Sequence, residues 1–437
     1  MRHKYEMLIE RNFYQNPSMY LVTKVTVIGE YNRNRIEDAI REMERVHPII
    51  TYVLEEGEEG KVYFVKKEDS KVKVKYFEKK SQDGWLSITR EEEFIPLEFD
   101  KEPSLRFLII HGKEDFDIVI LGHHLLGDGK SYQYLMHDLL EVYCNGTQNL
   151  PVQETRFIRE ISDLPKESEP PSEFVEEIHA VNKRWSSMRR QYTREEYLKL
   201  FTDHHEVHGL GLSVEAIDKE MFPLLINRCK EHGVTVNSAL VTAFTAVLYK
   251  LNKEEQKATV AVNLRDKLNF STNRCIANYS SAVSPKLKYN EEDTFWSNVE
   301  CIHKLLKEEL NQPSKTFAIL QLFCHMDGSI FDSLAQAANG TFQGEILMDV
   351  IRLLGFENRE QGFDLSNLGV IEMNPEMGEY FIKDYVFFAN PTTTYDFTVG
   401  VATFNEQLNL AICYKKNSVT EEEIQEYTRN VVELLCS

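Results

Sequence analysis

Several features that would point to a particular class of protein are missing from this sequence. Its seven cysteines are odd in number and never occur as CxxC, which argues against a disulfide framework and a structural zinc site. It has no apolar run of membrane-spanning length, no signal-peptide core at its start and no glycine-rich phosphate loop. We therefore expect a reduced, cytoplasmic protein with no membrane span, no metal and no tightly bound cofactor.

Basic residues are also scarce. The chain has 50 Lys and Arg against 70 Asp and Glu, a formal net charge of −20. Nucleic acid needs a basic surface, so we expect no nucleic-acid partner. An anionic cosubstrate such as coenzyme A, or an acidic carrier protein, would need a local basic patch. Residues 183–190 and 265–267 are candidates, although the first run also fits a solvated helix face.

One motif dominates what the sequence does contain. Residues 121–129 read LGHHLLGDG and include the pattern HHxxxDG, which is expected by chance in about one chain of this length in a thousand. An apolar stretch at 116–121 predicts a strand before it, and amphipathic spacing at 131–142 predicts a helix after it. Catalytic side chains are common where a strand ends in a loop. The alternative is a pair of structural histidines in a Gly-Asp-Gly turn.

The residues of this motif are well suited to proton transfer. A neutral imidazole can accept a proton near pH 7. Two adjacent residues at a strand end point in opposite directions, so one histidine can face a cavity while the other packs inward. Asp128 follows His124 across a turn that Gly127 and Gly129 permit, and it can hold the loop by ion pairing or orient a ring.

The chain resembles the chloramphenicol acetyltransferase-like superfamily, whose signature is HHxxxDG. This superfamily includes condensation domains of nonribosomal peptide synthetases, alcohol acetyltransferases and polyketide-associated acyltransferases. Weaker similarities follow in the family's order over nearly the whole chain, at 36–48, 95–106, 233–244, 262–265, 278–281 and 366–369. The segment DFTVG at 396–400 keeps three letters of the DFGWG motif of plant acyltransferases, which argues weakly against that subgroup.

The resemblance assigns a role to each residue of the motif. His124 would be the general base, His123 would be structural, and Asp128 would pair with an arginine from the other half of the protein. Arg265 is our candidate partner; the alternative is a surface charge at a strand end. Gly129 would lie at the floor of a tunnel, where a side chain would block the acyl donor. Tunnel or oxyanion residues are predicted among positions that could equally be ordinary strand residues: Tyr279, Ser281, Ser366 and Asn367.

The resemblance also implies the activity. We expect an acyltransferase that moves an acyl group from a thioester, acyl-coenzyme A in our first hypothesis, to an alcohol or amine without an acyl-enzyme. The close alternative is a stand-alone condensation enzyme whose substrates ride on phosphopantetheinyl carrier proteins. A third is a non-catalytic relative that recruits a partner. No adenylation or carrier segment is recognisable, so the protein is expected to act alone or in trans, as a monomer.

The resemblance implies an α/β fold, of the α+β sandwich type, with two chloramphenicol acetyltransferase-like subdomains in a pseudo-dimer around a central tunnel. We predict an N-terminal subdomain at 1–165, a linker and charged helix at 166–208, and a C-terminal subdomain at 209–437. Strands are expected in the first part at 20–28 and 105–111, and helices at 35–46, with Asn34 as N-cap, and 172–192. In the second part we expect helices at 218–232, 237–251, 291–311, 315–337 and 421–435. Its sheet would contain 258–264, 278–284, 365–373, 379–388, 395–404 and 407–414.

Two further clusters invite chemistry but are better explained otherwise. Residues 203–208 hold three histidines and two carboxylates, which we interpret as an exposed loop without metal. Cys324 and His325 are adjacent, and a nucleophile and its base usually meet through the fold instead, so we expect core and turn residues there.

Overall fold

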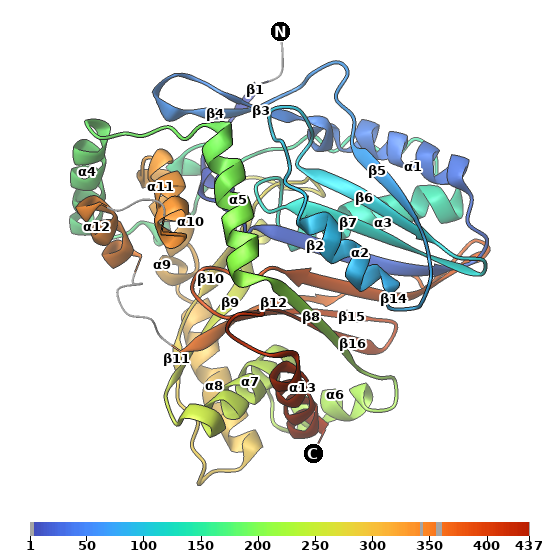
Figure 1. Cartoon of the computed structure of the whole chain (residues 1–437). Coiled ribbons are helices and arrows are strands. Elements are labelled where there is room, and N and C mark those ends of the chain that lie inside the picture. The colour runs from blue at the N-terminus through green and yellow to red at the C-terminus, as the bar shows by residue number, and fades with distance from the viewer. Residues whose placement is uncertain (1–3, 341–343, 355–360, 437) are drawn as a thin grey trace.

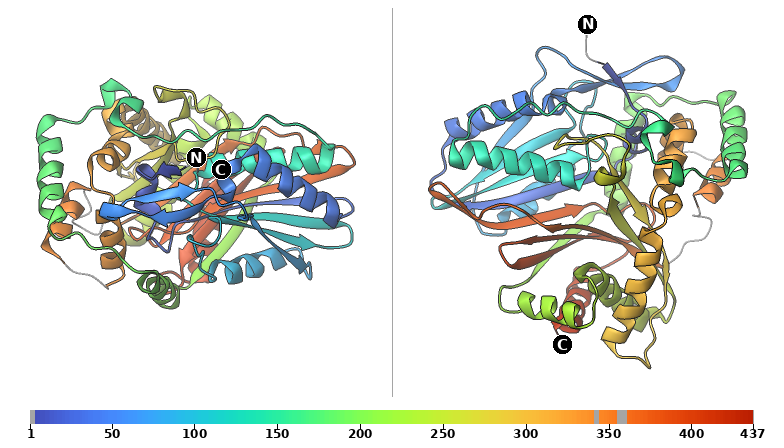
Figure 2. Two further views of the ribbon diagram at one scale, coloured as in Figure 1. Left: turned by 90° about the horizontal axis from the view of Figure 1, so that it is seen from above. Right: turned by 180° about the vertical axis from the view of Figure 1, so that it is seen from behind.

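The computed structural model describes residues 4–340, 344–354 and 361–436 of the chain (Figure 1). Two large sheets lie against each other, with helices on both faces of the first and on the outer face of the second (Figures 1 and 2). This is the mixed α/β architecture expected from the sequence.

The first large sheet carries the motif. In spatial order its strands are β13 (Glu376–Met377), β14 (Tyr380–Ala389), β2 (Tyr20–Ile28), β7 (Asp115–His123), β6 (Leu105–His111) and β5 (Lys73–Glu78). All pairs are antiparallel except β5 with β6. The helices α1 (Arg33–Val46) and α3 (Gly129–Asn145) lie side by side on one face, and α2 (Gly84–Glu93) lies on the other (Figures 1 and 2).

The second large sheet is mixed. Its order is β10 (Ser280–Val283), β9 (Gln256–Asn263), β12 (Gly362–Val370), β15 (Phe397–Phe404), β16 (Gln407–Lys415) and β8 (Leu210–Ile217), and β11 (Lys286–Leu287) also pairs with β9. The strand β12 runs parallel to both of its neighbours. The outer face of this second sheet is covered by α6 (Phe222–Glu231), α7 (Val236–Asn252), α8 (Phe295–Leu310) and α13 (Glu421–Cys436) (Figure 1).

Smaller elements complete the molecule. A three-stranded sheet contains β1 (Lys4–Glu6), β4 (Val62–Val65) and β3 (Val53–Glu56). The helix α4 (Ser172–Ser186) packs beside α10 (Ala318–His325) and α12 (Glu345–Leu353), and α11 (Ser329–Ala338) lies between α12 and the 3-10 helix η1 (Ile9–Phe13). The remaining helices are η2 (Pro48–Thr51), η3 (Glu58–Gly60), η4 (Ile161–Asp163), η5 (Lys166–Ser168), α5 (Arg194–His208), η6 (Arg265–Lys267) and α9 (Pro313–Thr316).

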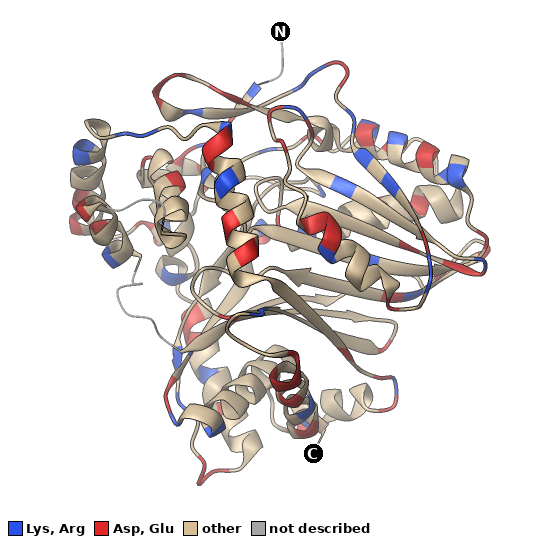
Figure 3. Cartoon of the chain, viewed as in Figure 1, with Lys and Arg blue, Asp and Glu red and all other residues tan. Residues whose placement is uncertain are grey.

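Charge follows this layering. Charged residues gather on outer helices such as α1, α5 and α13, while the strands of the second sheet carry few of them (Figure 3). Two arginines of the candidate basic run at 183–190 are paired with acids, Arg184 with Asp349 and Arg189 with Asp327. Across the described segments, no single helix meets the length and hydropathy of a membrane span; only α6 and α7 do so together, and they are bent by 98°.

The strand expected at 379–388 was assigned to the wrong sheet. It forms β14, which pairs antiparallel with β2 of the first sheet, so that Tyr385 lies opposite Val25. The backbone of β14 also packs against β15 and β16, and the two large sheets meet there. Whether the subdomain boundaries lie at residues 165 and 208 stays a prediction.

Three local predictions were also wrong: the extent of one helix, the N-cap of another and the place of the histidine cluster. The helix expected at 315–337 is split into α9, α10 and α11. At the break between α10 and α11, the Asn182 side chain donates to the His325 carbonyl (2.7 Å) and accepts from the Asp327 N–H (2.9 Å). The N-cap of α1 is Asn32, whose side chain accepts from the Arg35 N–H at 3.1 Å, instead of Asn34.

The histidine cluster at 203–208 belongs to α5 and not to an exposed loop. A capping box at Thr193 and Glu196 starts this helix, and His204 and His205 are buried. Burial lowers the pKa of His204 to about 4 and that of His205 to about 3. Both rings are therefore neutral packing groups.

Candidate functional site

The motif lies where β7 passes into α3. The strand ends at His123, a short turn follows, and α3 begins at Gly129. Asp128 is the N-cap of that helix, because its Oδ1 accepts a hydrogen bond from the Ser131 N–H at 3.0 Å. The aspartate thus fixes the direction in which the turn leaves the strand.

His123 points into the core. Its Nε2 lies 3.2 Å from the Asn16 carbonyl oxygen, and its ring packs edge-on against Tyr20 and Phe99. Burial lowers the pKa of His123 to about 3. The ring is neutral and does not line the cavity described below.

His124 faces a cavity and is only half-buried. The Phe13 ring stacks on its imidazole, with centroids 4.3 Å apart and planes at 12°. Its Nδ1 lies 2.9 Å from Oδ1 of Asn278. Burial lowers the pKa of His124, which keeps the imidazole neutral at pH 7.

The Asn278 amide determines which ring nitrogen carries the proton. Its Nδ2 donates to the carbonyl oxygens of His124 (2.8 Å) and Leu125 (3.3 Å), so its oxygen must face the imidazole. An amide oxygen only accepts, so Nδ1 of His124 carries the hydrogen. The lone pair on Nε2 is then available for a proton.

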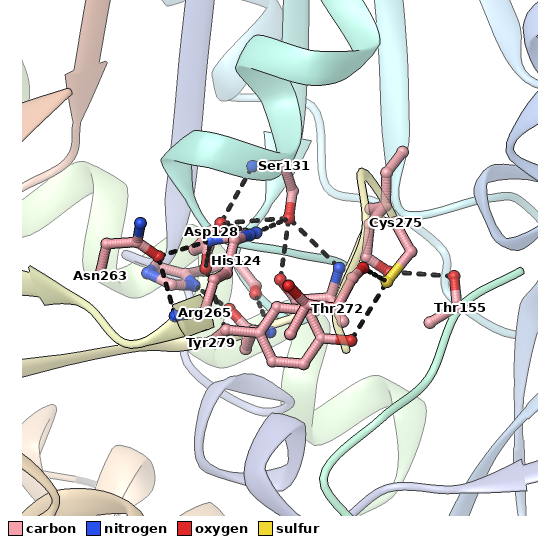
Figure 4. Close-up of polar contacts among 12 residues, drawn as sticks. His124, Asp128, Ser131, Thr155, Asn263, Arg265, Thr272, Cys275 and Tyr279 are labelled. Atoms are coloured by element: carbon pink, nitrogen blue, oxygen red, sulfur yellow. Dashed lines mark hydrogen bonds and ion pairs between the residues drawn. The ribbon is translucent and has the colours of Figure 1, made fainter. Parts of the chain in front are cut away.

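Asp128 and Arg265, predicted as partners from the sequence, form a bidentate ion pair (Figure 4). The Arg265 Nη1 and Nη2 donate to the two carboxylate oxygens at 2.9 and 2.7 Å, and the Tyr279 N–H donates to Oδ2 at 3.0 Å. Burial acts to raise the pKa of Asp128, but the Arg265 charge and these hydrogen bonds outweigh it and hold the pKa below its ordinary value. The pair joins the motif to the second half of the chain.

The other predicted residues fall into two groups. Gly129, Ser281, Ser366 and Asn367 line the cavity. Tyr279 does not: its ring is buried, and its hydroxyl donates to the Arg156 carbonyl.

These cavity residues differ in how their polar atoms are used. The buried Ser281 hydroxyl has no hydrogen-bond partner within the described segments, which leaves it available to a ligand. The Asn367 amide is occupied, since it donates to Asn237 and accepts from the Gly369 N–H. A Cβ on Gly129 would lie 2.8 Å from the Phe387 ring and 2.9 Å from the Leu368 side chain, so packing leaves little room for a larger residue there.

The cavity has a volume of about 1700 Å³ and is lined by residues of both halves of the chain. Sites for single small molecules typically measure about 300–1,000 Å³. This cavity therefore has space for two substrates beside His124. None of the described residues that line it is a cysteine.

Sequence reasoning missed Asn278 and Phe13 as site residues. Asn278 lies 154 residues beyond His124, and Phe13 lies in the 3-10 helix η1 near the N-terminus. No spacing rule connects either residue to the motif. The only available signal was the position of Asn278 in a segment already aligned with the superfamily.

Comparison with known proteins identifies the family to which this chain is similar. The family model described as "Condensation domain" matches residues 6–437. Beauvericin nonribosomal cyclodepsipeptide synthetase BEA1 of Gibberella fujikuroi is 23% identical over 289 residues, which are 63% of this chain and 9% of that protein. Cyclosporin synthetase simA of Tolypocladium inflatum is 22% identical over 367 residues, which are 82% of this chain and 2% of that protein. The chain thus spans less than a tenth of the length of these relatives.

Solved structures share the fold. The first condensation domain of the CDA synthetase superposes with a TM-score of 0.67 at 13% identity, covering 100% of this chain and 97% of that one. The TRI3 trichothecene 15-O-acetyltransferase from Fusarium sporotrichioides superposes with a TM-score of 0.68 at 12% identity, covering 100% and 95%. Both likenesses concern architecture, because the sequence identity is low.

Proposed function

Because this chain belongs to the condensation-domain family of acyl-transferring enzymes, we propose that it transfers an acyl group from a thioester to an alcohol or amine with His124 as general base. The observation that supports this role is that Asn278 fixes His124 in the tautomer with its proton on Nδ1. Its Nδ1–H donates to Asn278, and its half-buried ring lines a cavity large enough for two substrates.

The proposed reaction is direct transfer. The acceptor gives its O–H or N–H proton to Nε2 of His124 as its oxygen or nitrogen attacks the thioester carbonyl. The Ser281 hydroxyl, unpartnered within the described part of the chain, can donate to the resulting oxyanion. When the carbon–sulfur bond breaks, the leaving thiolate takes the proton from the imidazolium. The acyl group never bonds to the protein.

Asp128 and Arg265 would serve this reaction indirectly. Both side chains are buried, and their charged groups are engaged with each other. Their pairing fixes the turn that carries His124. His123, buried against aromatic rings, would likewise support the strand end.

The thioester could be presented by coenzyme A or by a carrier protein. Similarity to nonribosomal peptide synthetases favours the carrier-bound form, and similarity in fold to an acetyltransferase favours the free form. Turnover of acyl-coenzyme A would select the first hypothesis, and turnover only with phosphopantetheinyl carriers would select the condensation alternative. The seven cysteines are all free thiols, which supports the cytoplasmic location we propose.

His124→Ala tests the central role. The purified protein is incubated with a panel of thioesters and with alcohols or amines, and products are measured by mass. Removing a general base should lower kcat by about 10²–10⁴-fold. His205→Ala is the matched control, because His205 is also a neutral histidine but does not line the cavity. Full activity of His124→Ala would overturn the proposal, and a partner-recruiting role would then be the better explanation.

A further inference from the structure

Part of the cavity is lined by an unusually apolar wall. Three consecutive short helices, α10, α11 and α12, contribute it, and the side chains concerned are Leu320, Phe323, Phe331, Leu334, Leu347 and Met348. By contrast, β9, β12 and β15 line the same cavity with polar side chains such as Thr259, Asp364 and Thr398. The two kinds of lining call for different ligand chemistry.

The apolar wall is connected to the reaction centre. Phe13, which stacks on His124, belongs to η1, and η1 packs directly against α10 and α11. Ile9 and Phe13 of η1 line the cavity beside the wall. The 3-10 helix η1 therefore links the ring stacked on His124 to the helices of the wall.

The wall is held in place before any ligand binds. A buried ion pair joins η1 to α11, with Arg11 Nη1 donating to Asp332 Oδ1 at 3.0 Å. From the outer side, the Trp185 Nε1–H of α4 donates to the Ser329 hydroxyl at the start of α11, at 2.8 Å. A preformed apolar surface binds an apolar ligand without a large ordering cost.

The wall also reaches the surface. Met348 on α12 lines the cavity and is 55% exposed. An apolar side chain at the mouth of an apolar passage gains free energy only when something covers it.

We infer that one of the two substrates carries a long apolar chain, which lies along α10, α11 and α12 with its reacting end at His124. This inference rests on the proposed acyl transfer and specifies its substrate class. The chain can belong to the acyl donor or to the acceptor alcohol or amine, since burial of hydrocarbon is the same chemistry in both.

Two series of reactions distinguish these sources. In the first, acetyl-, hexanoyl- and dodecanoyl-pantetheine are compared with ethylamine and ethanol as acceptors. In the second, acetyl-pantetheine is compared with ethyl, hexyl and dodecyl amines and alcohols. In the series that varies the substrate bound along the wall, kcat/KM should rise by about fourfold for each methylene that becomes buried, until the wall is covered. The other series should stay flat.

Matched variants test where the hydrocarbon chain of the substrate binds. Met348→Asp places a charge at the mouth of the wall and should lower kcat/KM for the dodecyl or dodecanoyl substrate at least tenfold more than kcat/KM for acetyl transfer to a short acceptor. Met188→Asp is the control, because Met188 is equally exposed, at 56%, but does not line the cavity. Leu334→Trp should shorten the longest chain that is accepted. Equal effects of both Met variants would contradict the inference.

The outcomes separate this inference from the proposed function. If transfer between short substrates is measurable and both series are flat, the chain inference is wrong and the acyltransferase proposal stands. If no pair of substrates reacts, titration calorimetry of the full chain tests the apolar wall by itself. The probes are acetyl-pantetheine, dodecanoyl-pantetheine, ethylamine and dodecylamine. Tighter binding of either long-chain probe, weakened by Met348→Asp and not by Met188→Asp, supports the wall as a chain site; equal binding overturns it.

Discussion

At the scale of single residues, Asn278 controls the proton on His124. Asn278→Ala removes the acceptor of the Nδ1–H, so the ring is free to rotate and change tautomer, and kcat should fall at least about tenfold. The amide oxygen also raises the pKa of His124 against the effect of burial. The acidic limb of the pH–kcat/KM profile should therefore move to lower pH in this variant.

Asn278→Asp is the control, because it should shift the acidic limb of the pH–kcat/KM profile in the opposite direction. A carboxylate beside the imidazole stabilises its protonated form, so the acidic limb should move to higher pH. A merely structural role for Asn278 would lower activity in both variants without moving the limb in opposite directions. That result would remove Asn278 from the mechanism.

The Asp128–Arg265 pair is a second prediction at this scale. Because both side chains are buried, removing one leaves the other charge without its partner, and each single Ala variant should lose about 3–5 kcal/mol of unfolding free energy. The double variant should lose clearly less than the sum, as measured by urea denaturation. Additive losses would show that the two groups do not depend on each other.

The same pair predicts a pH dependence. The folded-state pKa of Asp128 is depressed, so its stabilisation is present above the pKa of the unfolded chain, about 3.9, and is lost as pH falls through the lower folded value. The stability difference between the protein and Asp128→Ala should thus be full at pH 7 and shrink below about pH 4. A difference that grows on acidification would contradict the assigned direction.

At the scale of elements, the sequence was informative wherever local patterns suffice. The strands β2 and β6 begin and end at the predicted residues, because alternation and β-branched content define them locally. The partner of β14 was not predictable, since pairing across more than 350 residues leaves no local pattern. Likewise, the HHxxxDG letters located the turn, but Asn278 and Phe13 reach His124 only through the fold.

The close packing of the two large sheets depends on one glycine. A Cβ on Gly400 of β15 would lie 2.2 Å from the Phe387 carbonyl oxygen and 2.7 Å from the Phe388 Cα. Both atoms belong to the backbone of β14, so no side-chain rotation relieves the clash. Gly400→Ala should therefore lower the unfolding free energy by about 3 kcal/mol.

Gly84→Ala is the matched control for this prediction. Gly84 begins α2, and its added Cβ would meet only the Ser81 hydroxyl at 3.3 Å. Alanine has the higher helix propensity, so stability should stay unchanged or rise by up to about 1 kcal/mol. Thermal and urea unfolding of both variants measures the contrast, and equal stability of the two would contradict the proposed close packing at Gly400.

At the scale of the whole molecule, the two halves depend on each other. The strand β14 comes from the last sixth of the chain and pairs with β2 in the first sheet. The cavity takes its lining from both halves, and the Asp128–Arg265 pair crosses between them. We therefore expect the full chain to unfold in one cooperative transition.

Fragments test this dependence. A fragment of residues 1–208 lacks β14, so the backbone of Tyr20–Ile28 is left as an exposed, strongly apolar edge. Such edges pair with other copies, and the fragment should sediment as aggregates without a cooperative melting transition. Co-expression with residues 209–437 should restore a soluble one-to-one complex, because β14 can then pair with β2. A fragment 1–208 that is monomeric and melts cooperatively would show that the first sheet is complete without the strand from the second half.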